Sequence, residues 1–323
     1  MIDGAEHATH AAQDRPIFVS IETTAFSGAT LLALLLSAHP QIVTIGEMNG
    51  LIAREDPDSY LCSCGQRIKR CAFWQAVADA MRERGFPFDP AHFDTELALG
   101  GPPVIQRLRK RRFRRPMLNT LRDALCDAYP GERQRVRRLV ARNAAFVESV
   151  LDVTGGRVFV DTSKDRLRLP TLRRFSALDL RAIHLVRDVR GVVASRLRRG
   201  AAIDTREAAR QWATLHDRIE RTLAGLPPDK RLLVRYEALC RDASDTLARL
   251  DRFCGVDPAL RSADLWPQSH HIIGNAMRLT QRTAISVDER WRAVLSEDQL
   301  AAIRLGAGTQ GWQYGYQARS ESW

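Results

Sequence analysis

The stretch of sequence that decides the fold is PIFVSIETTAFSGATLL, residues 16–32. Its apolar first part, Pro16–Ile21, predicts a buried strand, and its last part predicts the start of a helix, with a tight loop between them. A loop of this shape leaves backbone N–H groups without partners at a helix N-terminus, which makes it a binding site for an anion. Gly28 allows the backbone to approach a ligand closely, and the hydroxyls of Ser27 and Thr30 can add hydrogen bonds.

Short apolar runs recur along the chain and alternate with helical patterns. Strands are expected at Ile17–Ile21, Ile42–Ile45, Val158–Val160, Ala182–Val186 and Leu232–Val234. Helices are expected at Thr30–Ala38, Phe73–Arg84, Leu118–Ala128, Arg135–Val150, Arg168–Ser176, Val189–Arg198, Arg206–Leu223 and Ala238–Phe253. Strands that are apolar throughout and alternate with helices predict an α/β fold, a three-layer sandwich in which helices cover both faces of a central parallel sheet.

Residues 50 to about 156 break this rhythm with a cysteine cluster, a Gly-Gly-Pro-Pro break at 100–103 and a basic run, Arg107–Arg115. We expect a mainly helical insertion there, between the second and third strands of a single domain spanning residues 16–323. The polar residues 1–15 are expected to form a disordered tail. The basic run contains one aromatic residue, whereas binders of single-stranded nucleic acid interleave basic with aromatic residues. A solvated helix face is therefore expected, and nucleic acid is not an expected partner.

The 323-residue chain carries a formal net charge of +11, which favours acidic ligands such as nucleotides or sulfated molecules. Nearly all of its basic residues are arginines, because lysine occurs only at positions 69, 110, 164 and 230. Residues 1–15 lack the apolar core of a signal peptide, and no apolar run approaches the roughly 20 residues of a membrane span. Six cysteines in a chain of this length fit a reducing compartment, and we expect a cytoplasmic protein.

A second anion site is predicted by AIHLVRDVRGVVASRLRRG, residues 182–200. Its strand delivers Arg187 at the carboxyl end, where open α/β sheets bind ligands. Asp188 can cap the helix that follows, and Ser195 lies just over two helical turns beyond Arg187. An arginine at a strand end and a serine on the next helix can together clamp one phosphate. The alternative is that Arg187 pairs with a carboxylate and that Ser195 faces solvent.

With these motifs in this order, the chain resembles sulfotransferases that use 3′-phosphoadenylyl sulfate (PAPS). Their loop for the 5′-phosphosulfate has the pattern (R/K)SGTTLL, which corresponds here to FSGATLL at 26–32. Their 3′-phosphate element, VRDPRGVVxSxL, corresponds to residues 186–197, with Val189 in place of proline. Three more segments are similar: LSAHPQIVTIGE at 36–47, FVDTSKD at 159–165, and HHIIGNAMRL at 270–279 followed by ISVDERWRAVLS. The similarity extends from about residue 16 to residue 305, and the family's fold is itself related to that of P-loop kinases.

The resemblance implies which residues bind PAPS and its product PAP. The 5′-phosphosulfate would bind to the loop formed by Phe26, Ser27, Gly28, Ala29, Thr30 and Leu31. Arg187 and Ser195 would select the 3′-phosphate. Asn275 and Arg278, in the GNAMR segment, would hold phosphates or the base.

Phe26 departs from the family pattern. Relatives with arginine or lysine at this position use the cation to stabilise negative charge on the bridging oxygen during sulfuryl transfer. An aromatic ring cannot do this. Lys164 is the candidate substitute, because it follows the strand Val158–Val160 at its carboxyl edge. The alternative is an exposed surface lysine.

Glu47 is the candidate general base. It follows the strand Ile42–Ile45 at the same carboxyl edge, where a carboxylate can take the proton of an acceptor hydroxyl. The motifs are also similar to those of tyrosylprotein sulfotransferases, which use a glutamate in this GE context. The alternative is a structural carboxylate paired with an arginine. Of the two histidines near these motifs, His184 is expected to pack inside its strand and His39 to act as a helix cap.

Cys62, Cys64 and Cys71 form a cluster that also occurs in bacterial members of the family, as CxCG followed by CxFW. Three thiols could join a fourth ligand around a structural zinc ion. They could equally form one disulfide with a spare thiol, or be small buried residues. No fourth ligand is apparent nearby, and sulfuryl transfer from PAPS needs no metal, so we expect no metal in the reaction.

The sequence thus predicts a sulfotransferase that moves a sulfuryl group from PAPS to a hydroxyl of a small molecule, a carbohydrate or a peptide. One alternative is a catalytically impaired protein that binds PAP or PAPS, which the missing cation at Phe26 favours. Another is a P-loop kinase, although the loop lacks the Gly-Lys pair of that class. Acceptor specificity is expected to reside in residues 48–156, which carry no recognisable acceptor signature.

Overall fold

The computed structural model describes residues 15–50, 56–97, 100–111, 113, 115–267, 271–274, 279 and 284–316 of the chain. The tail that the sequence predicts to be disordered lies outside these residues, apart from Arg15. Two candidate nucleotide-binding residues, Asn275 and Arg278, also lie outside them.

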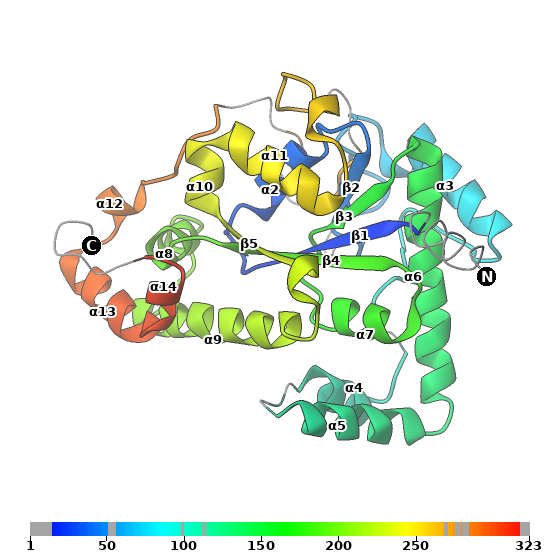
Figure 1. Cartoon of the computed structure of the whole chain (residues 1–323), viewed down its shortest axis with the longest axis horizontal. Helices are drawn as coiled ribbons and strands as arrows, with labels where there is room; N and C mark the ends of the chain where they lie inside the picture. The colour runs from blue at the N-terminus through cyan, green and yellow to red at the C-terminus, as the bar shows by residue number, and fades with distance from the viewer. Residues whose placement is uncertain are drawn as a thin grey trace, which may run out of the picture. The chain divides into compact units, whose positions relative to one another are not determined.

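Five strands form one sheet in the order β2-β3-β1-β4-β5, as Figure 1 shows. Their bounds are Ile17–Glu22 for β1, Ile42–Gly46 for β2, Val158–Asp161 for β3, Asp179–Val186 for β4 and Arg231–Arg235 for β5. β1 and β2 both pair with β3 in parallel, and β4 pairs with β5 in parallel. Every residue of β1 and β3 is buried, as expected of strands covered on both faces. The predicted α/β class is confirmed.

Helices connect the strands. Those of six or more residues are α2 (Ala29–Leu36), α3 (Ala72–Glu83), α4 (Pro103–Lys110), α5 (Pro116–Ala128), α6 (Glu132–Thr154), α7 (Arg168–Phe175), α8 (Val189–Leu197), α9 (Thr205–Leu223), α10 (Tyr236–Arg241), α11 (Ala243–Cys254) and α13 (Glu297–Ala307). The short α12 (Trp291–Val294) and α14 (Gln310–Gln313) flank α13. Among the described residues, no helix is long and apolar enough to span a membrane.

The prediction of one continuous helix at Ala238–Phe253 is wrong. The chain leaves the helical conformation at Asp242, so α10 and α11 are separate helices. The Asp242 side chain accepts a hydrogen bond from the N–H of Asp245 and thereby caps the start of α11. The predicted cap at Asp188 is confirmed, because its side chain accepts a hydrogen bond from the N–H of Arg190 at the start of α8.

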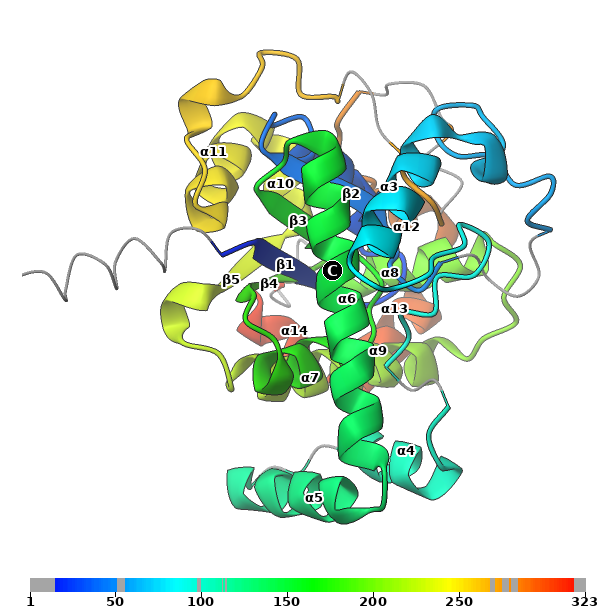
Figure 2. The same cartoon turned by 90° about the vertical axis from the view of Figure 1, so that its right-hand side faces the viewer.

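The chain divides into two compact units. The first comprises Met1–Ser20, Ala33–Arg181 and Ala259–Thr280, and the second comprises Ile21–Leu32, Ala182–Pro258 and Gln281–Trp323. In the first unit, the long helix α6 packs on β2 and β3 and against α3 (Figure 2). Phe146 of α6 is fully buried, with its ring 5.3 Å from that of Phe88, 5.4 Å from that of Phe93 and 6.4 Å from that of Phe159. This aromatic cluster attaches the insertion to the sheet.

The basic run at residues 107–115 includes the end of α4. Figure 2 shows α4 and α5 beside the N-terminal end of α6. Arg109 is buried, and its guanidinium lies 2.8 Å from a carboxylate oxygen of Asp127 on α5 and 3.1 Å from one of Glu132 on α6. The predicted solvated helix face is therefore wrong for Arg109, which holds three helices together, whereas Arg107 and Lys110 are exposed.

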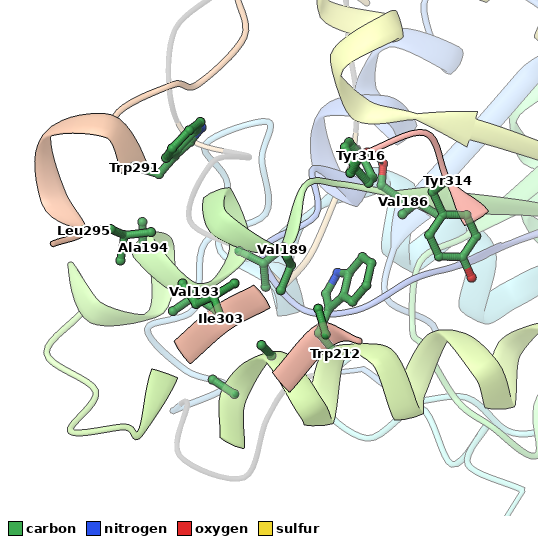
Figure 3. Packing of buried hydrophobic residues seen from close by; sticks show 14 residues of the cluster. Val186, Val189, Val193, Ala194, Trp212, Trp291, Leu295, Ile303, Tyr314 and Tyr316 are labelled. Carbon is green, nitrogen blue, oxygen red and sulfur yellow. Dashed lines mark hydrogen bonds between the residues drawn. The ribbon is translucent and has the colours of Figure 1, made fainter. Parts of the chain in front are cut away.

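The second unit has its own core (Figure 3). Trp212 of α9 is 2% exposed and packs with Val189 of α8, Ile303 of α13 and Tyr314. The amphipathic helix α9 begins at Asp204, whose side chain accepts a hydrogen bond from the N–H of Glu207. This core supports the end of β4 and the start of α8, the segment that carries Arg187.

Candidate functional site

The loop after β1 is shaped by two residues with left-handed backbone conformations. Phe26 has φ of 64° and Gly28 has φ of 88°. The Thr24 and Ser27 hydroxyls lie 2.7 Å apart in a hydrogen bond, and the Thr23 hydroxyl donates to the carbonyl of Leu185 at 2.6 Å. The loop is therefore tied to the end of β4 and leads directly into α2, whose first N–H groups have no partners within the helix.

Gly28 is required by a close approach as well as by its φ. A Cβ atom at this position would lie 2.6 Å from Cδ2 of Tyr236, the first residue after β5. No side chain fits at that distance. The ring of Tyr236 thus forms a wall beside the loop.

Arg187 connects the two predicted anion elements. It is 7% exposed, and its Nη1 donates to the carbonyl oxygen of Phe26 at 2.9 Å and lies 3.5 Å from the hydroxyl of Ser195. Its guanidinium also lies over the ring of Tyr236, 4.6 Å from the centroid. Ser195 is 8% exposed, so the alternative in which it faces solvent is wrong. The loop after β1, Arg187 at the end of β4 and Ser195 on α8 therefore lie together in the second unit.

The carboxylate partner of Arg187 is Asp288, which the sequence analysis did not single out. Its Oδ2 lies 3.1 Å from Arg187 and 3.2 Å from Arg198, and its Oδ1 lies 2.7 Å from Arg290. The hydrogen bonds from Arg290, with Arg187 beside them, hold the pKa of Asp288 well below its usual range. The alternative in which Arg187 pairs with a carboxylate is thus observed. In the sequence, the DERW segment that contains Asp288 could have indicated this partner.

A cation also lies near Phe26. The guanidinium carbon of Arg199, just beyond α8, lies 5.2 Å from the centroid of the Phe26 ring. A cation at this distance is attracted by the face of an aromatic ring. Sequence reasoning missed Arg199, because the arginine and the ring are far apart along the chain.

Glu47 and Lys164 form a pair in the first unit. Glu47 follows β2 and Lys164 follows β3, and these two strands are parallel neighbours, so both residues lie at one edge. The Lys164 Nζ lies 3.5 Å from Oε1 of Glu47 and donates to the carbonyl of Thr162 at 3.2 Å. Both side chains are about one-third exposed, at 30% and 32%. The predicted base and the predicted cation are therefore within reach of each other and of solvent.

Two of these candidate residues have unusual backbone conformations. Of the residues that the structure describes, only Phe26, Asp94 and Lys164 have positive φ without being glycine. A bulky residue in the left-handed region costs about 1–2 kcal/mol, and such residues cluster at functional sites. Phe26 and Lys164 both carry backbone strain of this kind, as does Asp94.

The two histidines near the motifs are both buried. His184 is buried in β4, and its Nε2 lies 2.8 Å from Nδ1 of His216. Burial lowers the pKa of His184 to about 4 and, with His184 beside it, that of His216 to about 3. Both rings are therefore neutral parts of the core near neutral pH. His39 is fully buried, and its Nδ1 accepts a hydrogen bond from the N–H of Gln41, so the side chain closes the turn between α2 and β2.

The cysteine cluster contains side chains that could bind a metal ion. All six cysteines are free thiols. Cys62, Cys64 and Cys71 gather together with His271 from the C-terminal part of the first unit. The sequence showed no fourth ligand because His271 lies 200 residues after Cys71.

Comparisons with known proteins identify the family. A family model described as "Sulfotransferase family" matches residues 26–259. No curated protein matches the chain. Among solved structures, the sulfotransferase domain of the Synechococcus PCC 7002 olefin synthase is 20% identical with a TM-score of 0.50, over 94% of this chain and 96% of that one.

Two further solved structures are similar. The sulfotransferase domain from the curacin biosynthetic pathway is 17% identical with a TM-score of 0.48, over 94% of this chain and 99% of that one. A sulfotransferase from Alicyclobacillus acidocaldarius is 14% identical with a TM-score of 0.36, over 93% and 99%. At such identities, the similarity to the olefin synthase domain concerns the fold and not the substrate.

Proposed function

Because the chain belongs to the sulfotransferase family, we propose that it transfers a sulfuryl group from PAPS to the hydroxyl of an acceptor. The observation that carries this proposal is the position of Arg187. Its guanidinium bonds to the loop after β1 and faces Ser195 on α8, although 161 residues separate it from Phe26. The two elements that the resemblance assigns to the two phosphates of PAPS thus share one arginine.

In the proposed complex, the loop binds the 5′-phosphosulfate. Residues 26–31 offer the hydroxyls of Ser27 and Thr30 and the first N–H groups of α2, where the helix dipole favours an anion. Arg187 and Ser195 bind the 3′-phosphate through charge-assisted hydrogen bonds. Asn275 and Arg278 complete the nucleotide contacts in this proposal.

The reaction that we propose is a direct displacement at sulfur. The acceptor oxygen forms a bond to sulfur, the bond from sulfur to the bridging oxygen breaks, and its electron pair leaves with PAP. Glu47 takes the proton of the acceptor hydroxyl, a role that typically contributes about 10²–10⁴-fold to the rate. The partly exposed carboxylate of Glu47 supports this role, because an acceptor can reach it.

Lys164 is proposed to stabilise the charge on the leaving oxygen. Phe26 carries no charge, so the cation must come from another residue. The Lys164 Nζ lies 3.5 Å from Oε1 of Glu47 and is held by its hydrogen bond to the carbonyl of Thr162 at 3.2 Å. A positioned cation aimed at developing charge is the usual source of catalysis in transfers of this kind.

The test begins with binding and turnover. Purified protein is titrated with PAP by calorimetry, with and without Mg²⁺, and is then incubated with radiolabelled PAPS and a panel of small-molecule, carbohydrate and peptide hydroxyls. We expect PAP to bind without Mg²⁺ and label to move to at least one acceptor class. Failure of both measurements would overturn the proposal, and a strict Mg²⁺ requirement would favour a kinase.

The roles of the pair are tested with Glu47→Gln and Lys164→Ala. Glu83→Gln and Lys110→Ala, at exposed positions on α3 and α4, serve as matched controls. We expect both site variants to lower kcat by at least about tenfold while PAP affinity stays close to that of the wild type. An active enzyme that is indifferent to both site variants would refute the assigned roles. PAP binding without any turnover would identify a binding protein instead.

A further inference from the structure

Three thiols and one imidazole meet outside the candidate site. Cys62 and Cys64 lie in the loop before α3, Cys71 immediately precedes α3, and His271 comes from the segment 271–274. The four potential ligand atoms all lie within 4.8 Å of one another. Cys62 and Cys71 are at most 1% exposed, whereas Cys64 lies at the surface.

Three of the six distances between these atoms match the edges of a coordination tetrahedron. Bonds of about 2.3 Å to sulfur and about 2.0 Å to nitrogen give edges of roughly 3.8 Å between sulfurs and roughly 3.5 Å between sulfur and nitrogen. The Sγ atoms of Cys64 and Cys71 are 3.6 Å apart. The Nδ1 of His271 lies 3.6 Å from Sγ of Cys62 and 3.5 Å from Sγ of Cys71.

The surrounding residues orient the ligands. The N–H of Cys62 donates to the carbonyl of Gln66 at 2.9 Å, and the N–H of Gly65 donates to the carbonyl of Cys62 at 2.9 Å, so the chain turns tightly around the first two thiols. Gly65 has φ of 86°, which favours glycine at this turn. The ring of His271 stacks on Phe73 with 4.3 Å between centroids. A ligand set that is already positioned binds a metal without much reorganisation.

We propose that Cys62, Cys64, Cys71 and His271 bind one zinc ion. Thiolates and imidazole are the ligands that zinc prefers in closed structural sites, and a Cys₃His set completes its four-coordinate shell. The three thiols release their protons as they bind the ion. No open coordination position remains for a substrate, so the ion has a structural role.

The site fixes the segment 271–274 to the body of the first unit. The N–H of Ile272 donates to the Ser63 hydroxyl at 2.7 Å, and the N–H of Gly274 donates to the Tyr60 hydroxyl at 2.8 Å. The N–H of Ile273 donates to the carbonyl of Ile45 in β2 at 2.8 Å. These hydrogen bonds already join the segment 271–274 to the rest of the first unit, and the metal adds coordination bonds between the same parts of the chain.

One consequence concerns the proposed base and rests on the proposed function. A Cβ atom at Gly274 would lie 3.4 Å from Cγ of Glu47, so the metal-held segment packs directly beside this carboxylate. Loss of the metal is expected to lower the rate through displacement of Glu47. The metal content itself is measured without any turnover, so the two proposals fail separately.

The first experiment measures metal in the wild-type protein. Protein purified without added metal or chelator is analysed by plasma mass spectrometry, and bound zinc is released with a thiol-blocking mercurial and titrated with a coloured chelator. We expect one zinc ion per chain. Replacement by Co²⁺ is expected to give the intense absorption of tetrahedral thiolate coordination. Protein that contains no zinc, takes up none, and shows no such cobalt spectrum would overturn the proposal.

Variants then assign the ligands. His271→Phe keeps a ring to stack on Phe73 but removes the nitrogen, and Cys64→Ser changes an exposed ligand. Both are expected to lose at least about tenfold in zinc affinity, whereas His271→Cys, which forms a Cys₄ set, is expected to retain the ion. His92→Phe and Cys254→Ser lie outside the cluster and serve as controls, with circular dichroism to check folding. Unchanged affinity in both ligand variants, or a Cys64–Cys71 disulfide in peptides mapped without reductant, would refute the assignment.

Discussion

Gly191 on α8 offers a sharp test of the Arg187 clamp, through the substitution Gly191→Ala. A Cβ atom at this position would lie 2.9 Å from Nε, 3.1 Å from Nη2 and 3.3 Å from Cζ of Arg187. Carbon atoms pack best at about 3.5–4.0 Å, so the guanidinium must retreat by roughly 0.5 Å. Its bond to the Phe26 carbonyl is 2.9 Å long, and such a shift would carry it beyond normal hydrogen-bond length.

Both the affinity for PAP and the stability are expected to fall. In the proposed complex the displaced guanidinium no longer reaches the 3′-phosphate, and a hydrogen bond to a charged group contributes about 1.5–3 kcal/mol, so the Kd for PAP is expected to rise roughly 10- to 150-fold. Loss of the bond to the Phe26 carbonyl lowers the free energy of unfolding by about 1.5–3 kcal/mol, and the preference of a helix for alanine over glycine offsets up to about 1 kcal/mol of this loss. Calorimetry with PAP and urea denaturation measure the two quantities.

A double-mutant cycle isolates the mechanism. If the added methyl group acts through Arg187, Gly191→Ala has no further effect on PAP affinity when Arg187→Ala is already present. Independent losses that add in the double variant would show that the methyl group acts elsewhere. Wild-type affinity in Gly191→Ala alone would refute the clamp geometry.

Three further predictions concern catalysis, pH and packing. Glu47→Gln is expected to lower kcat by about 10²–10⁴-fold with little change in the KM for PAPS, and initial rates with the wild-type kcat would contradict it. Burial lowers the pKa values of His184 and His216 below the ordinary 6.5, so their neutral form stabilises the fold above pH 6.5 and this stability is lost as pH falls towards 4. Between pH 7 and pH 5 the free energy of unfolding is expected to fall by about 2 kcal/mol per imidazole, and urea denaturation of His216→Gln is expected to show a smaller fall. Arg109→Ala removes a buried guanidinium from between Asp127 and Glu132, which keep Arg174 and Arg135 as partners. It is expected to cost about 1.5–3 kcal/mol of stability, against no measurable loss for the exposed control Arg107→Ala.

The sequence predicted the elements of the sheet because each strand is a local feature. An apolar run such as Ile17–Ile21 or Val158–Val160 predicts by itself a strand that is buried on both faces, and the strands β1 and β3 are buried throughout. Helix boundaries were less well predicted. The break at Asp242 depends on a single capping side chain inside an otherwise helical pattern.

The candidate site was predictable where its residues occur in continuous motifs. The loop at residues 26–31, the strand-end Arg187 and the helix serine Ser195 are each visible in a few letters of sequence, and the structure brings them together. The contacts of Asp288 and Arg199 were not recognised, because each joins residues that are far apart in the sequence. The buried state of Arg109 was missed for the same reason, since its partners lie on other helices.

The sequence by itself determined the α/β class, the strand-loop-helix arrangement around Phe26, and the absence of a cationic side chain at this position. Local periodicity, glycine content and residue type decide these properties over a few residues. Only the tertiary structure decided which residues contact that loop: Tyr236 lies beside Gly28, Arg187 bonds to the Phe26 carbonyl, and Arg199 lies over the Phe26 ring. It also decided that His271 joins three distant thiols. Such contacts form between residues that are far apart in the sequence, so no short stretch of sequence encodes them.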